Sequence, residues 1–404
     1  MIVPFIFNME TVNEYDHIAP FYMYFEMTKK HGWPVIAHER YCQPLKTMAR
    51  LGLGDMWFEA MRKKFRFGKP AQDELDLAPF YMISAEFEQS LIGRFPSQLD
   101  AWIYLLKNRD ESFEEYIEQL LDRIAADFEE PIEAFQCFCS TESLKYIARK
   151  RGIPIIHNEF GPFRPPTYDF HTGYFDLKDM YGTGELEDRY KTFLVEAEKK
   201  PVPILSRKEL ISLMADKKML PQLMDIMDMK PVYELGVALP TMNYGLTIKD
   251  TLMSAAELKM NALRRYDYDQ VVFRGHPNQA YGGGVMNNDV SPSSFHFICK
   301  CKRVAAVKSN VLFETLLLGK LACAYGEAPY YFMSNKGMAD PSETIASLEF
   351  INFVVFGYLV PWEWVTDENY IRYRLGNPSP TDIYMKHFEH YMQTRAETAD
   401  CAVI

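Results

Sequence analysis

The chain has 404 residues, of which 48% are hydrophobic and 25% are charged, and this composition excludes a disordered chain. Its net charge of −11 argues against nucleic-acid binding through overall charge, so we expect no nucleic-acid partner. The length allows two or three domains with a sizeable hydrophobic core.

The opening segment 1–8 (MIVPFIFN) is apolar, but Glu10 follows at once, which predicts a first strand rather than a secretory signal. The longest apolar stretch, 348–360, contains Glu349 and Asn352 and is too short to span a bilayer. We therefore expect a cytoplasmic protein, and peripheral contact with the inner face of the membrane stays an open alternative.

The first half alternates short apolar runs with helical patterns, which is typical of an α/β fold. Strands are predicted at 2–7, 78–84, 134–139 and 153–160, and helical stretches at 21–31, 44–65, 97–128, 143–152 and 185–200. Ser140 and Thr141 stand where they can cap the helix 143–152. A strand, a helix and a strand in so short a span predict two parallel strands.

The segment 199–209 is predicted as a linker, and a second alternating set of elements follows it. Strands are predicted at 232–240, at the start of 268–277, at the start of 304–310 and at 321–326, and helices at 248–261, 293–301 and 311–320. We therefore predict two Rossmann-like domains facing a cleft. The expected boundaries are 1–200, 201–345 and a helical segment 346–404 that crosses back to brace the first domain.

In a parallel sheet, ligands bind beyond the carboxyl ends of the strands. Arg274 and His276 directly follow the apolar run VVF, and a guanidinium beside an imidazole suits a phosphate or nucleotide. Pro277 fixes this loop. The alternative is an ordinary surface turn.

Ser309 and Asn310 stand where the helix 311–320 begins directly after a strand. Backbone N–H groups and the helix dipole make such a start an anion site, although Ser309 equally suits a routine N-cap. Glu314 lies one turn further on, where it can accept ribose hydroxyls or simply face solvent.

Glu159 ends the strand 153–160, where a carboxylate can act as a general base or hold a transferring hydroxyl. His157, Asn158 and Arg164 surround it in the sequence. The alternative is a surface glutamate in a loop.

The remaining motifs indicate neither a metal nor a dinucleotide. Asp267-Tyr268-Asp269 precedes its strand, at the edge opposite the ligand, so a solvated loop is expected. The triple glycine 282–284 lacks the spacing of a dinucleotide fingerprint and predicts a flexible loop. The seven cysteines form no regular framework, and the pairs 137/139 and 299/301 lack further ligands, so buried free thiols are expected. We expect no metal and no cofactor.

In the second half, FRGHP is followed by KSNVLFETLLLGKLACAYGEAPYYF. Across roughly 268–332 the order is therefore an HP loop, a serine opening a helix, a strand and a Gly-Pro-aromatic turn. This order resembles that of bacterial capsule and O-antigen β-Kdo glycosyltransferases of the capsule-synthesis type. In the first half, NEFGPFRPPTY resembles the family's acidic loop. The matching helix and turn residues are Phe313–Lys320, Gly326, Pro329 and Tyr330.

The resemblance implies a metal-independent GT-B glycosyltransferase that moves an acidic sugar, Kdo, from a CMP-activated donor to a surface-polysaccharide or lipid-linked glycan. The first domain would hold the acceptor and the second the nucleotide. Glu159 would match the catalytic carboxylate loop, with Asn158 and Arg164 near a sugar. The nucleotide-binding residues implied are Arg274, His276, Pro277, Ser309, Asn310 and Glu314, with His276 also stabilising the leaving phosphate.

One departure concerns the nucleophile. Retaining members of the family are expected to present an aspartate after the first strand of the second domain, where this chain has Thr241, Met242 and Asn243. Glu234 is the nearest carboxylate, although it lies inside the predicted strand. The alternatives are a GT-B enzyme that uses a UDP- or GDP-sugar and a non-catalytic glycan-binding relative.

Overall fold

The computed structural model describes residues 1–9, 18–39, 74, 78–179, 184–240, 253–276, 287–340 and 342–400. The predicted helix 44–65, Pro277, the triple glycine and residues 241–243 lie outside these ranges. Contacts divide the described residues into two compact units. Unit 1 comprises the described residues of Met1–Glu159 and Asp176–Lys178, and unit 2 comprises Phe160–Phe175 and the described residues from Asp179 onward.

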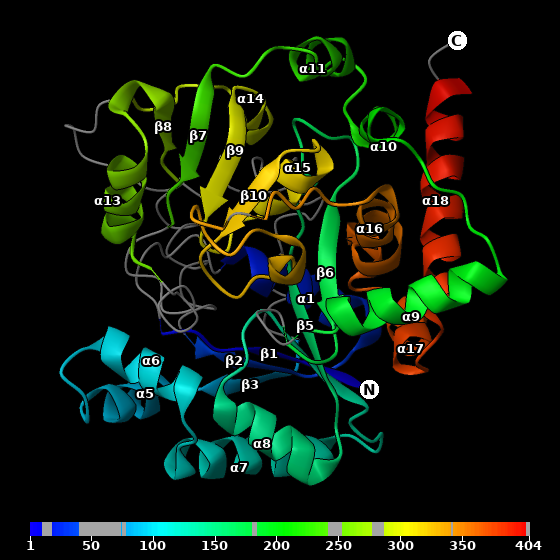
Figure 1. Cartoon of the computed structure of the whole chain (residues 1–404). Helices are drawn as coiled ribbons and strands as arrows, with labels where there is room; N and C mark the ends of the chain where they lie inside the picture. The colour runs from blue at the N-terminus through cyan, green and yellow to red at the C-terminus, as the bar shows by residue number, and fades with distance from the viewer. Residues whose placement is uncertain are drawn as a thin grey trace. The chain divides into compact units, whose positions relative to one another are not determined.

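Unit 1 is built on parallel strands, as the βαβ pattern predicts (Figure 1). They lie in the order β5-β4-β1-β2-β3, so the chain builds outward on one side of β1 and then returns to its other side. This reversal makes the carboxyl ends of β1 and β4 the place where doubly wound sheets bind ligands. The bounds are β1 Ile2–Ile6, β2 Val35–His38, β3 Phe80–Ile83, β4 Ala134–Cys137 and β5 Ile155–Phe160.

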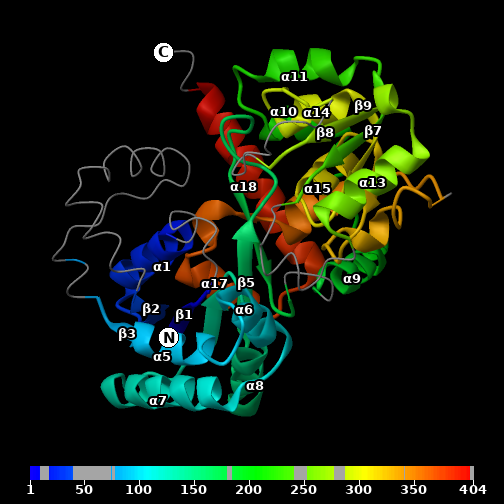
Figure 2. The ribbon, with the colours of Figure 1, turned by 90° about the vertical axis from the view of Figure 1, so that its left-hand side faces the viewer.

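The helices of unit 1 cover both faces of its sheet. In Figures 1 and 2, α1 lies on one side and α7 on the other, with α8 beside α7. The predicted stretch 97–128 is two helices, because the Asp110 side chain accepts from the Phe113 N–H and starts a new helix there. Their bounds are α1 Ile18–His31, α5 Ala85–Ile92, α6 Gln98–Lys107, α7 Glu111–Asp127 and α8 Glu142–Arg151.

Unit 2 contains a second parallel sheet with the order β10-β9-β7-β8. The chain passes from β7 to β8 on one side and then to β9 on the other, so the order reverses between β7 and β9. The bounds are β7 Tyr233–Ala238, β8 Val271–Arg274, β9 Cys301–Ala306, β10 Leu321–Ala324, α13 Ala255–Arg265, α14 Ser294–Cys299 and α15 Val311–Leu317.

Alternate residues of this sheet enter two separate apolar cores. Leu235 and Val237 pack with α13 residues such as Leu258, whereas Ala238 faces the core that contains α14 and α15. Gly236 belongs to the second face, where an added Cβ would lie 2.7 Å from both the Phe297 ring and the Cys301 sulfur. Glycine at this position therefore lets α14 approach the sheet closely.

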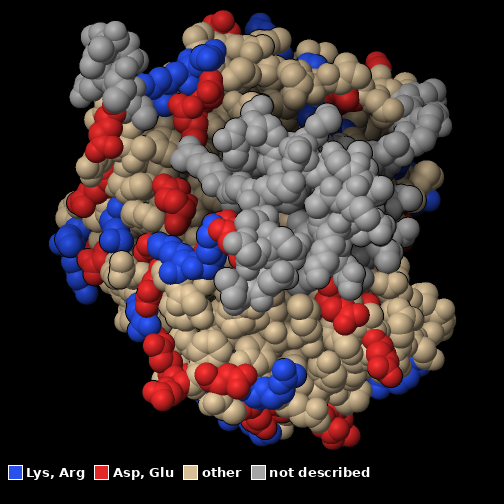
Figure 3. Space-filling model, turned by 180° about the vertical axis from the view of Figure 1, so that it is seen from behind, with Lys and Arg blue, Asp and Glu red and all other residues tan. Residues whose placement is uncertain are grey.

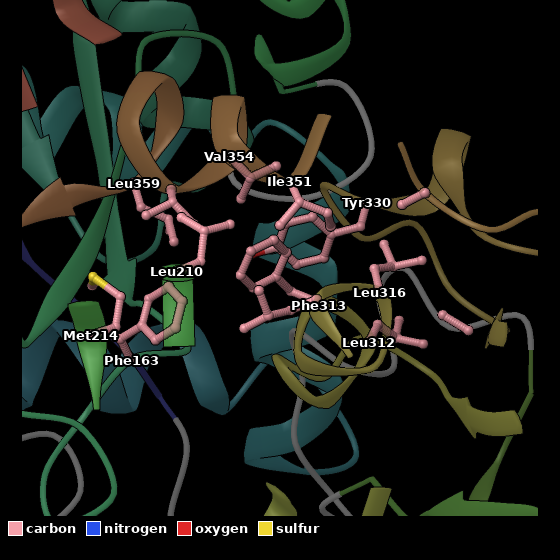
Figure 4. Close-up of a cluster of buried hydrophobic side chains, with 14 of the residues drawn as sticks. Phe163, Leu210, Met214, Leu312, Phe313, Leu316, Tyr330, Ile351, Val354 and Leu359 are labelled. Atoms are coloured by element: carbon pink, nitrogen blue, oxygen red, sulfur yellow. The ribbon is translucent and has the colours of Figure 1, made fainter. Parts of the chain in front are cut away.

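Helices that follow and precede the sheet complete unit 2. The larger core joins α10 and α15 to the segment 351–359, with Phe313 and Tyr330 among the side chains shown in Figure 4. The helix α18 packs against α9 and the π-helical turn Phe353–Tyr358, so the C-terminal segment contacts 186–199, which we expected in the first domain. The remaining bounds are β6 Thr172–Asp176, α9 Leu186–Lys199, α10 Arg207–Met214, α11 Leu220–Met227, α16 Leu348–Asn352, β11 Val360–Pro361, α17 Glu368–Leu375 and α18 Pro380–Asp400.

The predicted linker 199–209 is pinned within unit 2. The buried Asn352 amide donates to the Leu205 carbonyl and accepts from the Leu205 N–H, both at 2.8 Å, and α10 starts two residues later.

In the part of the chain that the structure describes, no helix is both long enough and apolar enough to cross a membrane. Over the described surface in Figure 3, Lys and Arg are interspersed with Asp and Glu.

Candidate active site

Ser309 follows β9 at the reversal point of the unit 2 sheet, where a doubly wound fold binds its ligand. Its Oγ accepts a hydrogen bond from the Val311 N–H at 3.2 Å, so Ser309 does act at the start of α15. The half-buried Lys308, which precedes it, brings a cation that the sequence analysis did not single out. The position of Lys308 directly after an apolar strand was the sequence signal that could have identified it.

Asn310 is engaged inside unit 2. Its Nδ2 donates to the Phe160 carbonyl at 2.9 Å, and its Oδ1 accepts from the Tyr174 hydroxyl at 2.7 Å. The side chain therefore joins the start of α15 to a segment far away in the sequence. Its predicted contact with a nucleotide stays a prediction.

Glu314 is buried, with 5% of its surface exposed, so the solvent-facing alternative is wrong. Tyr168 donates to its Oε1 at 3.1 Å. Burial raises the pKa of Glu314, while hydrogen bonds from Ser294 and Tyr168 oppose the rise. Tyr168 therefore already occupies one oxygen of this carboxylate.

Arg274 stands at the carboxyl end of β8, as expected, but an acidic partner holds it. Its guanidinium donates to the Asp289 carboxylate and to the Ser291 carbonyl, and the Asp289 side chain is only 1% exposed. Sequence reasoning missed Asp289 because it follows Arg274 by fifteen residues, without an intervening strand pattern. His276 is half-buried two residues after the end of β8.

Glu159 is half-buried near the carboxyl end of β5, in the position that the sequence predicted. Because strand side chains alternate, Glu159 shares a face of β5 with His157. Tyr24 lies within electrostatic range of Glu159, and burial raises the pKa of Tyr24 well above its ordinary value, with Cys137 and Glu159 adding to the rise.

His157 forms a defined hydrogen-bonded pair with Ser140. Its Nδ1 lies 3.3 Å from the Asp176 backbone carbonyl, which can only accept, so Nδ1 carries the hydrogen. Its Nε2 lies 3.0 Å from the Ser140 hydroxyl. Both side chains are buried, so these two contacts fix the orientation of the imidazole on the same strand as Glu159.

Asn158 points away from this pair into the interior of unit 1. It is 0% exposed, and its Oδ1 accepts from Gln136 Nε2 at 2.6 Å and from the Tyr24 hydroxyl at 3.2 Å. This location argues against the predicted sugar contact and makes Asn158 a support for β5. Arg164 is half-buried in unit 2 and lies within electrostatic range of Glu314.

Glu234 lies near the amino end of β7, where it forms an exposed ion pair with Lys302. Ligands bind at the opposite edge of a parallel sheet, so this position argues against a catalytic role for Glu234. Asp267 likewise precedes β8 and caps the short turn 268–270.

Among the described residues, no group of three His, Cys, Asp or Glu side chains could hold a metal ion. Cys137, Cys299, Cys301 and Cys323 are buried free thiols, and Cys139 is a half-buried one. Burial raises the pKa of Cys299 to about 11 and that of Cys301 to about 12, so both thiols stay protonated and unreactive.

The first half of the chain is similar to a class of glycosyltransferases: residues 13–185 match the glycosyltransferase 99 family N-terminal domain. The match includes Glu159 and ends before the sheet of unit 2. Two solved structures from Thermosulfurimonas dismutans are also similar to the chain. KpsC, beta Kdo 2,7 transferase, is 14% identical over 63% of this chain and 90% of its own, with a TM-score of 0.38. KpsC, beta Kdo 2,4 transferase, is 17% identical over 56% and 80%, with a TM-score of 0.37. No curated protein sequence matches the chain.

Proposed function

We propose that this chain is a glycosyltransferase of the GT-B arrangement, which moves Kdo from CMP-Kdo to a surface-polysaccharide or lipid-linked glycan. The observation that carries the proposal is the match of residues 13–185 to a glycosyltransferase N-terminal domain, because that segment contains Glu159 at the carboxyl end of β5. The reaction takes place in the cytoplasm, at the inner face of the membrane where a lipid-linked acceptor would be held.

The nucleotide would bind to unit 2 beyond the carboxyl ends of its sheet. Ser309 stands at the reversal point between β7 and β9, and His276 follows the neighbouring strand β8. A CMP-sugar carries one phosphate, whose charge a serine hydroxyl, backbone N–H groups and an imidazole can stabilise as the sugar leaves. No further cofactor is part of this proposal.

Glu159 would act on the sugar as the catalytic carboxylate, either as a general base or by holding the acceptor hydroxyl. The residues after β7, Thr241, Met242 and Asn243, offer no second carboxylate. Retention of the anomeric configuration is the outcome that the family resemblance predicts, and NMR of the purified product would decide it.

Calorimetry with CMP and UDP tests the donor class. We expect CMP to bind and UDP to bind more weakly, and equal inertness of the two nucleotides would remove the proposal. Preference for UDP would instead favour another GT-B enzyme.

Glu159→Gln should abolish transfer and leave CMP affinity nearly intact, whereas loss of both would contradict a purely catalytic role. Lys208→Ala, which breaks an exposed pair with Asp228, is the matched control.

A further inference from the structure

The segment 160–175, which directly follows Glu159, is a tightly closed loop. The Gly161 N–H donates to the Thr172 carbonyl at 2.8 Å, and the Thr172 N–H donates to the Phe163 carbonyl at 3.1 Å. A Cβ added to Gly161 would lie 2.3 Å from Thr172 Oγ1 and 2.8 Å from the Thr172 carbonyl oxygen. Only glycine allows the two ends of the 160–175 loop to meet in this way.

This loop is attached to the start of α15 through Asn310. The amide donates to the carbonyl of Phe160, the residue next to Glu159, and accepts from the Tyr174 hydroxyl at the other end of the loop. The Tyr174 hydroxyl also contacts the hydroxyl of Tyr330, and both tyrosines are buried. One side chain therefore holds both ends of the loop.

A second attachment lies one helical turn further along α15. Tyr168, near the middle of the loop, donates to the buried Glu314 carboxylate. The Phe163 ring packs edge-on against Phe313 with their centroids 5.9 Å apart, and both rings belong to the cluster in Figure 4. Polar and apolar contacts thus fix the same loop to the same helix.

We propose that Asn310 and Glu314 are positioning residues that fix the 160–175 loop, and with it the backbone on the carboxyl side of Glu159, rather than ligands of the nucleotide. This inference rests on the proposed function of Glu159. The Asn310 amide already donates to the Phe160 carbonyl and accepts from the Tyr174 hydroxyl, so the loop sets its orientation. The Glu314 side chain is buried and already accepts a hydrogen bond from Tyr168.

Ser309 differs from Asn310 in its contacts, so the experiment compares variants of these two residues. Within the described residues, Ser309 Oγ accepts from the Val311 N–H, and its own hydroxyl hydrogen can donate to a phosphate oxygen. Asn310→Ala removes both the N–H that donates to Phe160 and the acceptor for Tyr174, and it adds no charge beside Ser309. Tyr174→Phe removes one hydroxyl and is the milder second variant.

The experiment measures CMP affinity, steady-state transfer and amide hydrogen exchange for each variant. For Asn310→Ala we expect kcat to fall about 10- to 100-fold, because small displacements of a reacting group cost that much. The KM for the donor and the CMP affinity should stay within about threefold, and Glu314→Gln should likewise preserve CMP affinity. Exchange in peptides from 160–175 should rise about tenfold, while α8 (142–151) stays unchanged. Ser309→Ala should show the reverse: CMP affinity about tenfold weaker and unchanged exchange.

The inference is overturned if Asn310→Ala weakens CMP binding as Ser309→Ala does, or if exchange in the loop does not change in Asn310→Ala and Tyr174→Phe. If the wild-type protein binds no CMP, the proposed donor fails separately, and the exchange data still decide whether Asn310 holds the loop. Faster exchange with unchanged kcat would also contradict the inference, because the loop would then be fixed without any effect on Glu159.

Discussion

The ion pairs that Glu185 forms with Arg189 and Arg374 lead to a specific prediction about the stability of unit 2. Glu185 accepts from Arg189 at 2.7 Å and from Arg374 at 2.8 Å, and Arg374 is only 1% exposed. Arg374 also donates to the Phe175 carbonyl and the Tyr370 hydroxyl, so one guanidinium joins α17 to β6. Burial and the neighbouring Arg374 together lower the pKa of Arg189.

Glu185→Gln removes the negative charge that both guanidiniums share. Taking one partner from a buried ion pair costs about 3–5 kcal/mol, because the charge left behind is not compensated. Arg374→Met should cost less, about 1–2 kcal/mol, because the Glu185–Arg189 pair remains neutral and only hydrogen bonds are lost. At about 2–4 °C per kcal/mol for a unit of this size, Glu185→Gln should lower the melting temperature by roughly 10 °C.

Differential scanning calorimetry of both variants provides the measurement, with Lys208→Ala as the control for an exposed pair. We expect Glu185→Gln to melt several degrees below Arg374→Met. Equal melting temperatures, or a less stable Arg374→Met, would refute the reasoning, because the two arginines would then not depend on Glu185 for compensation.

Two further predictions concern the loop after Glu159 and the response of unit 2 to acid. Gly161→Ala should reduce transfer at least tenfold and speed exchange in 160–175, since its Cβ would collide with Thr172; wild-type rates would contradict the close approach. Burial, with Arg374 and Arg189 nearby, lowers the pKa of His387 well below its ordinary value. Its neutral form therefore stabilises the fold above about pH 6.5, and this contribution is lost as pH falls, by up to about 1.4 kcal/mol per pH unit. Unfolding measured from pH 7 to 5 should show a shallower loss for His387→Gln than for the wild type, and equal slopes would contradict this.

The sequence predicted those parts of the fold that local patterns specify. The βαβ unit from β4 to β5 appears with Thr141 as the N-cap of α8 and Gly152 in the left-handed conformation at its end. The four strands of the second sheet also appear close to their predicted positions. Each of these elements carries its own apolar run and its own capping or turn residues.

The elements that were missed depend on partners far away in the sequence. The strand β2 has only four residues, and β6 pairs in antiparallel fashion with β11, where Gly173 lies opposite Val360. No local sequence pattern predicts this strand pairing. The π-helical turn 353–358 packs against α18, and its own residues give no local pattern that predicts a π-helix.

The residues of the candidate site also fall into two groups: those whose positions local patterns predicted, and those whose surroundings depend on partners far away in the sequence. The positions of Glu159 and Ser309 near strand ends were predictable, because sequence patterns indicate where strands end. The burial of Asn158 and Glu314 was not predictable, because it depends on Tyr24, Gln136 and Tyr168, which the fold brings to them. Residue type at a strand end therefore predicted where Glu159 and Ser309 lie in the fold, but not which side chains contact their neighbours.

The most direct test of the account follows the release of CMP from CMP-Kdo by the purified protein in the presence of a capsule-type glycan. We predict that free CMP and an extended glycan form together, and that Glu159→Gln yields neither while still retaining CMP. Consumption of a UDP- or GDP-sugar with CMP-Kdo left intact would contradict the account.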